Sequence, residues 1–356
     1  MALLEAWLRK FLRSCFVKIR EVSNSSPSQR PTLKTLSELT GLAVPTVSRA
    51  LSNAPDISPS TKQRVRQVAA EIGYRPNRAG VRLRTGRTQV IAIVLLTSHD
   101  VMTQTAMLIE SIASELRGTD YHVNILPFFP DEDPMSVVRY VVETGAADGI
   151  ILNGIMPDDA RIEYLQQLNF PFACHGRSRV HDNYPWVDFD HRAWASLAIE
   201  QFASRQRKNI VLVAPPSDQS YGIEFISGSR DAAGLHEVNV QILETANSAS
   251  SIEETLRALT DFWQANPSTD AFLCSSSTSA LVLIGLAKDK NLSIGKDFDI
   301  VTREFMPLFA HLDDSIISVL EDIRGAGEFL ARAIVQSIES PDDVPMQMLD
   351  LPRFKS

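Results

Sequence analysis

The chain is poor in cysteine and has no long apolar run. Its three cysteines, Cys15, Cys174 and Cys274, are scattered over 356 residues without the spacing of a zinc site. An odd and scattered set excludes a disulfide framework and is typical of a protein from a reducing cytoplasm. No stretch approaches the run of about eighteen apolar residues that a membrane-spanning helix needs.

The motifs of common enzyme classes are also missing. The sequence contains no phosphate-binding loop, no Gly-x-Gly-x-x-Gly after a strand, no Gly-x-Ser-x-Gly and no His-Glu-x-x-His. Its seven histidines show no metal-ligand spacing. We therefore expect no catalytic residue, no metal and no cofactor, and we interpret the chain as a binding protein rather than an enzyme.

Residues 1–30 have apolar side chains at helical spacing with basic side chains between them. Arg9, Lys10 and Arg13 interrupt the apolar run that a secretory signal requires. We expect a leader of undefined order outside the folded domains. An amphipathic helix for a membrane surface or a partner protein is the alternative.

Charge divides the chain into two modules. Residues 28–90 carry eleven Lys/Arg and three Asp/Glu, a net charge of +8, and residues 1–27 carry five and two, a net +3. Because the whole chain has a net charge of −8, residues 91–356 carry −19. A small basic module suits a polyanion, whereas a large acidic module suits solubility and repels DNA from its own surface.

The basic module has the pattern of three short helices. Thr32 is placed to cap LKTLSELT, which Gly41 ends, and Pro45 lies in the first turn of a second helix at about 44–52. Ser58 and Pro59 start a third helix, which stops at Gly73. Apolar residues at three-to-four spacing predict one small shared core of Leu36, Leu39, Val47, Leu51, Val65, Val68 and Ile72.

That core leaves Thr46, Ser48, Arg49 and Ser52 on the outer face of the second helix. Two short helices joined by a glycine-containing turn predict a helix-turn-helix, whose second helix enters the DNA major groove. The TVSRALSN core, the ISPST helix start and the GYRPN exit occur together at one spacing. With these motifs, residues 31–77 resemble the DNA-binding headpiece of the lactose-repressor (LacI/GalR) family of bacterial transcription regulators.

The resemblance implies a role for each polar side chain of the headpiece. Arg49 is suited to a bidentate contact with a guanine edge. The positions of Val44 and Pro45 are the family's variable base-reading pair, and here they offer only apolar contact, such as with a thymine methyl group. The implied phosphate contacts, which set register, are Thr32, Thr46, Ser48, Ser52, Thr61, Tyr74 and Asn77.

Residues 78–89 resemble the hinge helix of the same family. Leu83 stands where an apolar side chain enters the minor groove and bends the duplex, and Arg84 suits a phosphate. A plain basic linker is the alternative for this segment.

From residue 90 short apolar runs alternate with amphipathic stretches. The runs are VIAIVLL, HVNILPF, DGIILNG, FPFACHG, NIVLVAP, VQILE, AFLCSS and DIVTR. Such alternation predicts an α/β fold of parallel sheets with helices on both faces, in two lobes with a ligand site at the strand ends. Residues 90–356 resemble, more loosely, the periplasmic-binding-protein-like domain of the same family. The resemblance implies dimerisation and a small-molecule effector, most often a sugar.

Polar and aromatic side chains at the expected strand ends are the candidate ligand contacts. An aromatic face with carboxylates and arginine suits a polyol, because hydroxyls both donate and accept hydrogen bonds. Glu304 stands where the family has an acid that binds sugar hydroxyls, and Asp190 is interpreted as a helix cap. The candidate set is Ser98, His99, Asp100, His175, Arg177, Trp186, Asp188, Phe225, Ser276 and Glu304.

Three departures from the family pattern widen the choice of ligand. Phe225 stands where the family often has arginine, Ser276-Ser277 replaces Asn-Asp, and Thr302-Arg303-Glu304 replaces Gly-Tyr-Asp. Phe225 is suited to stacking on a ring. A nucleobase or a disaccharide such as an α-glucoside therefore stays open beside the family's usual pyranose.

We interpret the chain as a cytoplasmic, ligand-responsive regulator, a repressor that binds a pseudo-palindromic operator as a homodimer. Ligand binding between the lobes would reorient the hinge segments and change operator affinity. The chain ends in LDLPRFKS without a heptad tail, which favours a dimer over a tetramer. The alternative is a sugar receptor of the periplasmic-binding type without DNA regulation, which the basic headpiece and the lack of a signal peptide disfavour.

The groove placement of the second helix predicts unequal effects of two substitutions. Arg49→Ala should abolish discrimination between operator and unrelated duplex, because the arginine carries the polar readout. Val44→Ala should weaken this discrimination by only about 1 kcal/mol, since it removes apolar contact alone. Quantitative gel shifts measure both, and equal losses would contradict the placement.

Overall fold

The computed structural model describes residues 31–75, 82, 86–97, 102–129, 131–179 and 183–353. The chain divides into two compact units, and the boundary in the sequence lies between Gly86 and Arg87, within the segment 78–89 expected to be a hinge. Inside the described residues, no helix combines the length and the apolar composition needed to cross a bilayer.

The first unit contains the three predicted headpiece helices, α2 (Leu33–Thr40), α3 (Val44–Leu51) and α4 (Pro59–Glu71). Thr32 caps α2, because its hydroxyl accepts a hydrogen bond from the Thr35 amide at 3.2 Å. Gly41 ends α2 in the left-handed region at φ 66°, which glycine adopts without strain. Ser58 caps α4 through the Thr61 amide at 3.3 Å.

The predicted headpiece core is confirmed except for Leu39. Leu36, Val47 and Val65 are fully buried, and Leu51, Val68 and Ile72 pack against them. Leu39 is 56% exposed, so its assignment to the core was wrong. The inward face of α2 is defined by Leu36 and Thr40, and Leu39 lies to one side of it because successive helical residues are rotated by about 100°.

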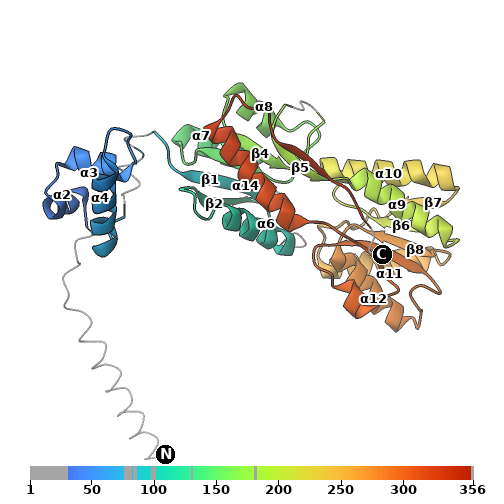
Figure 1. Ribbon diagram of the computed structural model, residues 1–356. Helices are drawn as coiled ribbons and strands as arrows, with labels where there is room; N and C mark the ends of the chain where they lie inside the picture. The colour runs from blue at the N-terminus through green and yellow to red at the C-terminus, as the bar shows by residue number, and fades with distance from the viewer. Residues whose placement is uncertain are drawn as a thin grey trace, which may run out of the picture. The chain divides into compact units, whose positions relative to one another are not determined.

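The second unit has two lobes, each built on a parallel sheet (Figure 1). The strand order is β11-β5-β4-β3-β1-β2 in the N-lobe sheet and β10-β9-β8-β6-β7 in the C-lobe sheet. The N-lobe strands are β1 (Val90–Leu96), β2 (His122–Phe128), β3 (Gly149–Leu152), β4 (Phe172–His175), β5 (Trp186–Phe189) and β11 (Gln347–Asp350). The C-lobe strands are β6 (Asn209–Val213), β7 (Asn239–Ile242), β8 (Ala271–Cys274), β9 (Asp299–Glu304) and β10 (Ile317–Leu320).

Helices cover both faces of each sheet. The N-lobe helices are α6 (Met102–Glu115), α7 (Pro134–Thr144), α8 (Ala160–Gln167) and α14 (Ile323–Glu339). The C-lobe helices are α9 (His191–Ser204), α10 (Ser220–His236), α11 (Ile252–Ala265), α12 (Ser277–Asp289) and the short α13 (Phe309–Leu312). Alternate residues of β1 enter two different cores, Ile91 and Ile93 on one face and Ala92 and Val94 on the other. The predicted fold class is confirmed.

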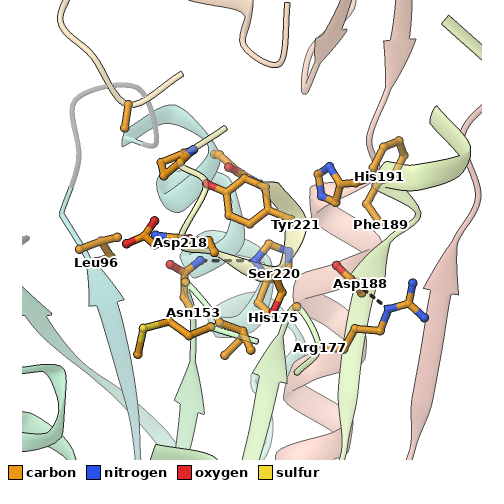
Figure 2. A pocket seen from close by; sticks show the side chains of 18 of the residues that line it. Leu96, Asn153, His175, Arg177, Asp188, Phe189, His191, Asp218, Ser220 and Tyr221 are labelled. Carbon is orange, nitrogen blue, oxygen red and sulfur yellow. Dashed lines mark hydrogen bonds and ion pairs between the residues drawn. The ribbon is translucent and has the colours of Figure 1, made fainter. Parts of the chain in front are cut away.

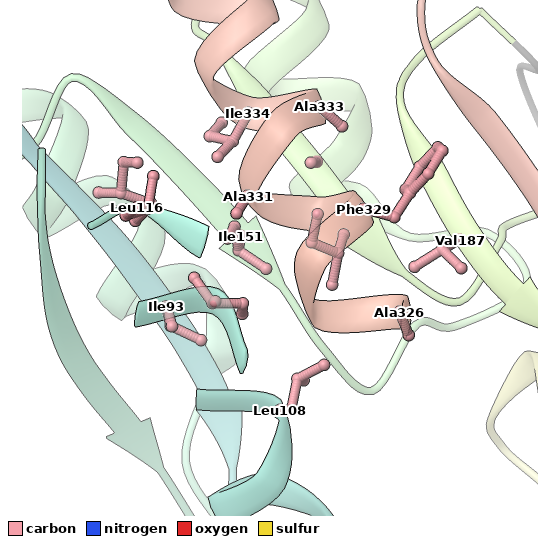
Figure 3. Packing of buried hydrophobic residues seen from close by; sticks show 14 of the residues in the cluster. Ile93, Leu108, Leu116, Ile151, Val187, Ala326, Phe329, Ala331, Ala333 and Ile334 are labelled. Carbon is pink, nitrogen blue, oxygen red and sulfur yellow. The ribbon is translucent and has the colours of Figure 1, made fainter. Parts of the chain in front are cut away.

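Helix α14 packs against α6 and the N-lobe sheet (Figure 3). Leu330 and Ile334 of this helix are fully buried beside Ile93 of β1 and Ile151 of β3. Gly327 allows the close approach of α14 to α6, because a Cβ there would lie 1.8 Å from the Ser111 hydroxyl oxygen and 2.9 Å from the Leu108 carbonyl oxygen.

Two described crossovers connect the lobes. Asp190 alone separates β5 of the N-lobe from α9 of the C-lobe, and it caps α9 through the Ala193 amide at 2.9 Å, as the sequence predicted. Glu321 and Asp322 separate β10 of the C-lobe from α14 of the N-lobe. Both crossovers follow the carboxyl ends of strands, where ligand sites of open α/β sheets lie.

The close packing of α14 on α6 gives a stability prediction. Gly327→Ala should lower the free energy of unfolding by about 2–3 kcal/mol, because the backbone oxygen of Leu108 cannot rotate away as a side chain can. Gly234→Ala is the matched control, because a Cβ on this exposed glycine of α10 meets nothing within 4 Å. The control should be neutral or gain about 0.5 kcal/mol. Urea unfolding measures both, and equal effects would refute the packing argument.

Candidate functional site

A cavity of about 310 Å³ lies in the second unit, where strands of both lobes end (Figure 2). Its N-lobe wall includes side chains after β3 and on β4 and β5, and its C-lobe wall includes the first residues of α9 and α10. The polar lining includes Asn153, His175, Arg177, Asp188, His191, Asp218, Gln219, Ser220, Arg303 and Glu321. Apolar side chains, among them Leu96, Phe128, Met156 and Phe305, form the rest.

Two arginines of the pocket are each held by a carboxyl group. The Arg177 Nε donates to Asp188 Oδ2 at 2.9 Å, and Arg303 Nη1 donates to Glu321 Oε2 at 2.5 Å. Burial raises the pKa of Asp188 to about 7, although Arg177 acts in the opposite direction. Burial also raises the pKa of Glu321, against the effect of Arg303. The pocket therefore contains two guanidinium groups that are held in place by hydrogen bonds to carboxyl groups.

Two histidines complete this end of the pocket, His191, which is buried, and His175, which is half-buried. Burial, with a smaller contribution from Arg303, lowers the pKa of His175 to about 4. Burial, with smaller contributions from Arg303, His175 and Arg177, lowers the pKa of His191 well below its usual value. Both imidazoles are therefore neutral near pH 7, and each offers one donor and one acceptor. Asn153 Nδ2 lies 3.5 Å from His175 Nδ1.

Three buried polar atoms in the pocket wall have no hydrogen-bond partner among the described residues. They are His191 Nδ1, Ser220 Oγ and Arg303 Nε. An unpaired buried polar atom costs about 1–3 kcal/mol, so such atoms are rare unless water or a ligand satisfies them. Within the described part of the chain, no group of three or more His, Cys, Asp or Glu side chains is arranged to hold a metal. The wall therefore suits a ligand with several hydroxyl groups.

The structure brings three of the predicted ligand contacts together. His175, Arg177 and Asp188 line the pocket. Trp186 is not part of the lining, and the Arg177 guanidinium carbon lies 5.5 Å from its ring centroid, so the ring supports Arg177. Ser98, His99 and Asp100 lie outside the described residues.

Three other candidates are buried in the protein and contact only protein groups, so we remove them from the set of ligand contacts. Phe225 is fully buried, with its ring centroid 5.1 Å from that of Trp194. Ser276 is buried and caps α12 through the Ser279 amide at 3.2 Å. Glu304 is 1% exposed and accepts from the Ser318 hydroxyl at 2.7 Å and the Leu308 amide at 2.8 Å. None of the three lines the pocket.

Sequence reasoning missed several lining residues. Asn153 follows the run GIIL directly, so the rule that strand ends meet at the ligand site would have found it. His191 and Ser220 are first residues of helices. Arg303 was noted only as a departure from the family pattern, and no sequence signal marked Glu321 as a pocket residue.

The headpiece presents its predicted DNA-contacting side chains as follows. Val44 is 39% exposed, the Arg49 side chain is 57% exposed, and Pro45 is exposed. Thr32 and Ser52 are exposed, while Thr46, Ser48, Thr61 and Tyr74 are half-buried. Asn77, Leu83 and Arg84 lie outside the described residues.

Two family models match the chain. Residues 32–77 match the model of bacterial regulatory proteins of the lacI family, and residues 90–350 match the model of periplasmic binding proteins and the sugar binding domain of the LacI family. The chain belongs to the LacI family. The resemblance inferred from the headpiece motifs is therefore confirmed, and members of this family are transcription regulators rather than enzymes.

Individual LacI-family proteins match over most of their length. The HTH-type transcriptional regulator AglR of Rhizobium meliloti is 29% identical over 323 residues, which is 89% of this chain and 90% of AglR. The lac repressor dimer bound to operator and the anti-inducer ONPF superposes with a TM-score of 0.78 at 17% identity, covering 92% of this chain and 98% of that one. The complex of the regulator CelR with cellobiose gives 0.66 at 20% identity, covering 92% and 99%.

The raised pKa of Asp188 predicts a pH-dependent stability. Because this pKa rises from 3.8 to about 7 on folding, the native state retains a proton that the unfolded chain releases. The contribution of Asp188 is thus fully present below about pH 4, declines as pH rises and is lost above about pH 7. In urea unfolding from about pH 4 to about pH 8, the stability of wild type relative to Asp188→Asn should fall and then level off. A constant difference would contradict this assignment.

Proposed function

We propose that this LacI-family regulator is a sugar-responsive repressor, with a neutral sugar as its effector in the pocket. The observation that carries the proposal is the set of unpaired buried atoms, His191 Nδ1, Ser220 Oγ and Arg303 Nε, in one cavity between the lobes. Hydroxyl groups fit these atoms, because each hydroxyl can donate and accept. The cavity also lies in the range of small-molecule sites, which begins at about 300 Å³.

The charge of the wall favours an uncharged ligand. Arg177 and Arg303 each donate to a carboxyl group of the wall, so part of each guanidinium is already occupied inside the protein. Glu132 and Asp218 also line the cavity. CelR, a structural neighbour, is known in complex with cellobiose, which supports a saccharide rather than a nucleobase.

On the DNA side, we propose that the headpiece binds a pseudo-palindromic operator as part of a homodimer. Arg49 reads a guanine edge, and Val44 and Pro45 make apolar contacts with neighbouring bases. Leu83 and Arg84 act from the hinge in the minor groove. The proposed phosphate contacts are Thr32, Thr46, Ser48, Ser52, Thr61, Tyr74 and Asn77.

Coupling between the two sites follows from the crossovers. A ligand that binds both pocket walls favours one angle between the lobes, and Asp190 and Glu321 lie on the segments about which that angle changes. The ligand alters operator affinity to the extent that its own affinity differs between the two arrangements. This role places the protein in the cytoplasm with the DNA and requires no catalysis, and the lacI-family headpiece disfavours a receptor without DNA regulation.

A substitution in the pocket should separate sugar response from DNA binding. Asn153→Ala removes a donor and an acceptor from the lining and should weaken sugar binding about ten- to hundredfold, with operator affinity in the absence of sugar unchanged. A thermal-shift screen of mono- and disaccharides identifies the sugar, and calorimetry measures the affinity. Gln241→Ala, an exposed change on β7 outside the pocket, is the control. Sugar binding that survives Asn153→Ala unchanged would move the site elsewhere, and a screen without any hit would overturn the proposed effector class.

A further inference from the structure

One ion pair distinguishes Arg49 from the other basic residues of the headpiece. Its guanidinium Nη2 contacts Asp56 Oδ2, with the two side chains 57% and 45% exposed. No other basic side chain within residues 31–75 has a carboxylate partner among the described residues. The headpiece is basic and suited to a polyanion. Arg49, the arginine best placed to read a base, is nevertheless the one whose charge is compensated by a carboxylate, that of Asp56.

Stability of the headpiece does not explain this pair. Exposed ion pairs contribute about 0–1 kcal/mol. The turn between α3 and α4 is already fixed by backbone hydrogen bonds, from the Ala54 amide to the Arg49 carbonyl at 3.0 Å and from the Ile57 amide to the Ala54 carbonyl at 3.2 Å. Ile57 also packs against the headpiece core. Backbone hydrogen bonds and the packing of Ile57 therefore hold Asp56 beside Arg49, and the stability of the headpiece does not depend on the ion pair.

The contact changes what Arg49 is able to bind. A free guanidinium is attracted to any phosphate, and such contacts carry no sequence information. A guanidinium next to a carboxylate loses much of that attraction, and the carboxylate itself repels phosphate. Guanine offers two neutral acceptors instead, and the five N–H groups of arginine allow one edge to stay on Asp56 while another meets the base.

The second effect is on the conformational entropy of the side chain. A free arginine loses about 2 kcal/mol of rotamer entropy when it is fixed in one geometry. Asp56 restrains Arg49 before DNA arrives, so less freedom remains to be lost on a base edge. Both effects act in the same direction, toward specific binding.

We propose that Asp56 is a positioning residue that makes Arg49 selective, by presenting it to guanine and keeping it away from phosphate. The proposal rests on the proposed role of Arg49 in base reading. The negative charge of Asp56 by itself weakens DNA binding, yet in this proposal Asp56 improves the discrimination between DNA sequences.

The test uses the full chain and two probes. One probe is the duplex that the wild-type protein selects from a random-sequence library, and the other is its scrambled permutation. Fluorescence anisotropy gives both dissociation constants at several salt concentrations. Asp56→Asn should bind the scrambled duplex about three- to tenfold tighter, with a salt slope steeper by about one per headpiece, because Arg49 is then available to phosphate. The ratio of the two constants should fall about tenfold.

Two controls separate positioning from simple charge. Glu38→Gln makes the same charge change on an exposed residue of α2 that has no basic partner among the described residues, and it should shift both probes equally. In an Arg49→Ala background, Asp56→Asn should tighten binding of the scrambled duplex no more than Glu38→Gln does, because no guanidinium at position 49 is released to phosphate. Thermal unfolding checks that each variant is folded.

The outcomes distinguish this inference from the proposed function. If the wild-type protein selects no sequence and binds both probes alike, the proposed function and the inference both fail. If the wild type discriminates but Asp56→Asn keeps the full ratio, only the inference fails. If Asp56→Asn tightens binding of the scrambled duplex as much in the Arg49→Ala background as in the wild type, Asp56 acts without Arg49, which also overturns the inference.

Discussion

The pocket depends on a buried ion pair between Arg303 of the C-lobe and Glu321 of the crossover to α14. Both side chains are less than a tenth exposed, and removing one partner of such a pair costs about 3–5 kcal/mol. The Arg303 guanidinium carbon also lies 5.1 Å from the Phe305 ring centroid. Burial is the main cause of the low pKa values of His175 and His191, and the charge of Arg303 adds to it. Burial also raises the pKa of Asp188, and the charge of Glu321 makes a smaller contribution in the same direction. The protonation pattern of the pocket thus follows from burial, and the charges of this ion pair reinforce it.

The position of this pair also links the pocket to the angle between the lobes. Glu321 lies one residue before Asp322, which caps α14 through the Gly325 amide at 2.9 Å. Asp322 in turn lies near Asp350 at the end of β11. A ligand that accepts a hydrogen bond from Arg303 Nε therefore contacts a residue that is itself hydrogen-bonded to Glu321 in the crossover between β10 and α14. Because α14 packs closely on α6 and a packed core resists gradual deformation, a small shift at Glu321 would move the two helices together.

Local patterns explain how much of the fold and the site the sequence could predict. The headpiece helices and the alternating strands follow from caps and periodicity, which neighbouring residues determine. The strand-end rule found His175 and Asp188, but it does not give the direction of a side chain. Adjacent strand residues point to opposite faces, so when Arg303 faces the pocket, Glu304 faces Ser318 instead. Only the packing of α9 and α10 places His191 and Ser220 in the same wall, and no local signal encodes it.

In both the headpiece and the ligand-binding unit, an arginine that is suited to ligand contact is paired with a carboxyl group, but the exposed fractions of these pairs differ. Arg303 is held by Glu321 inside the protein, where the low dielectric makes the contact strong and fixes the donor geometry, and Arg177 is held by Asp188 with its side chain 36% exposed. Arg49 is held by Asp56 in solvent, where the same contact is weak and easily opened. Donors in the pocket must keep one geometry to recognise a small ligand, whereas a DNA-reading arginine must exchange partners as the headpiece samples many duplexes. The depth of each ion pair therefore matches the rigidity that its binding partner requires.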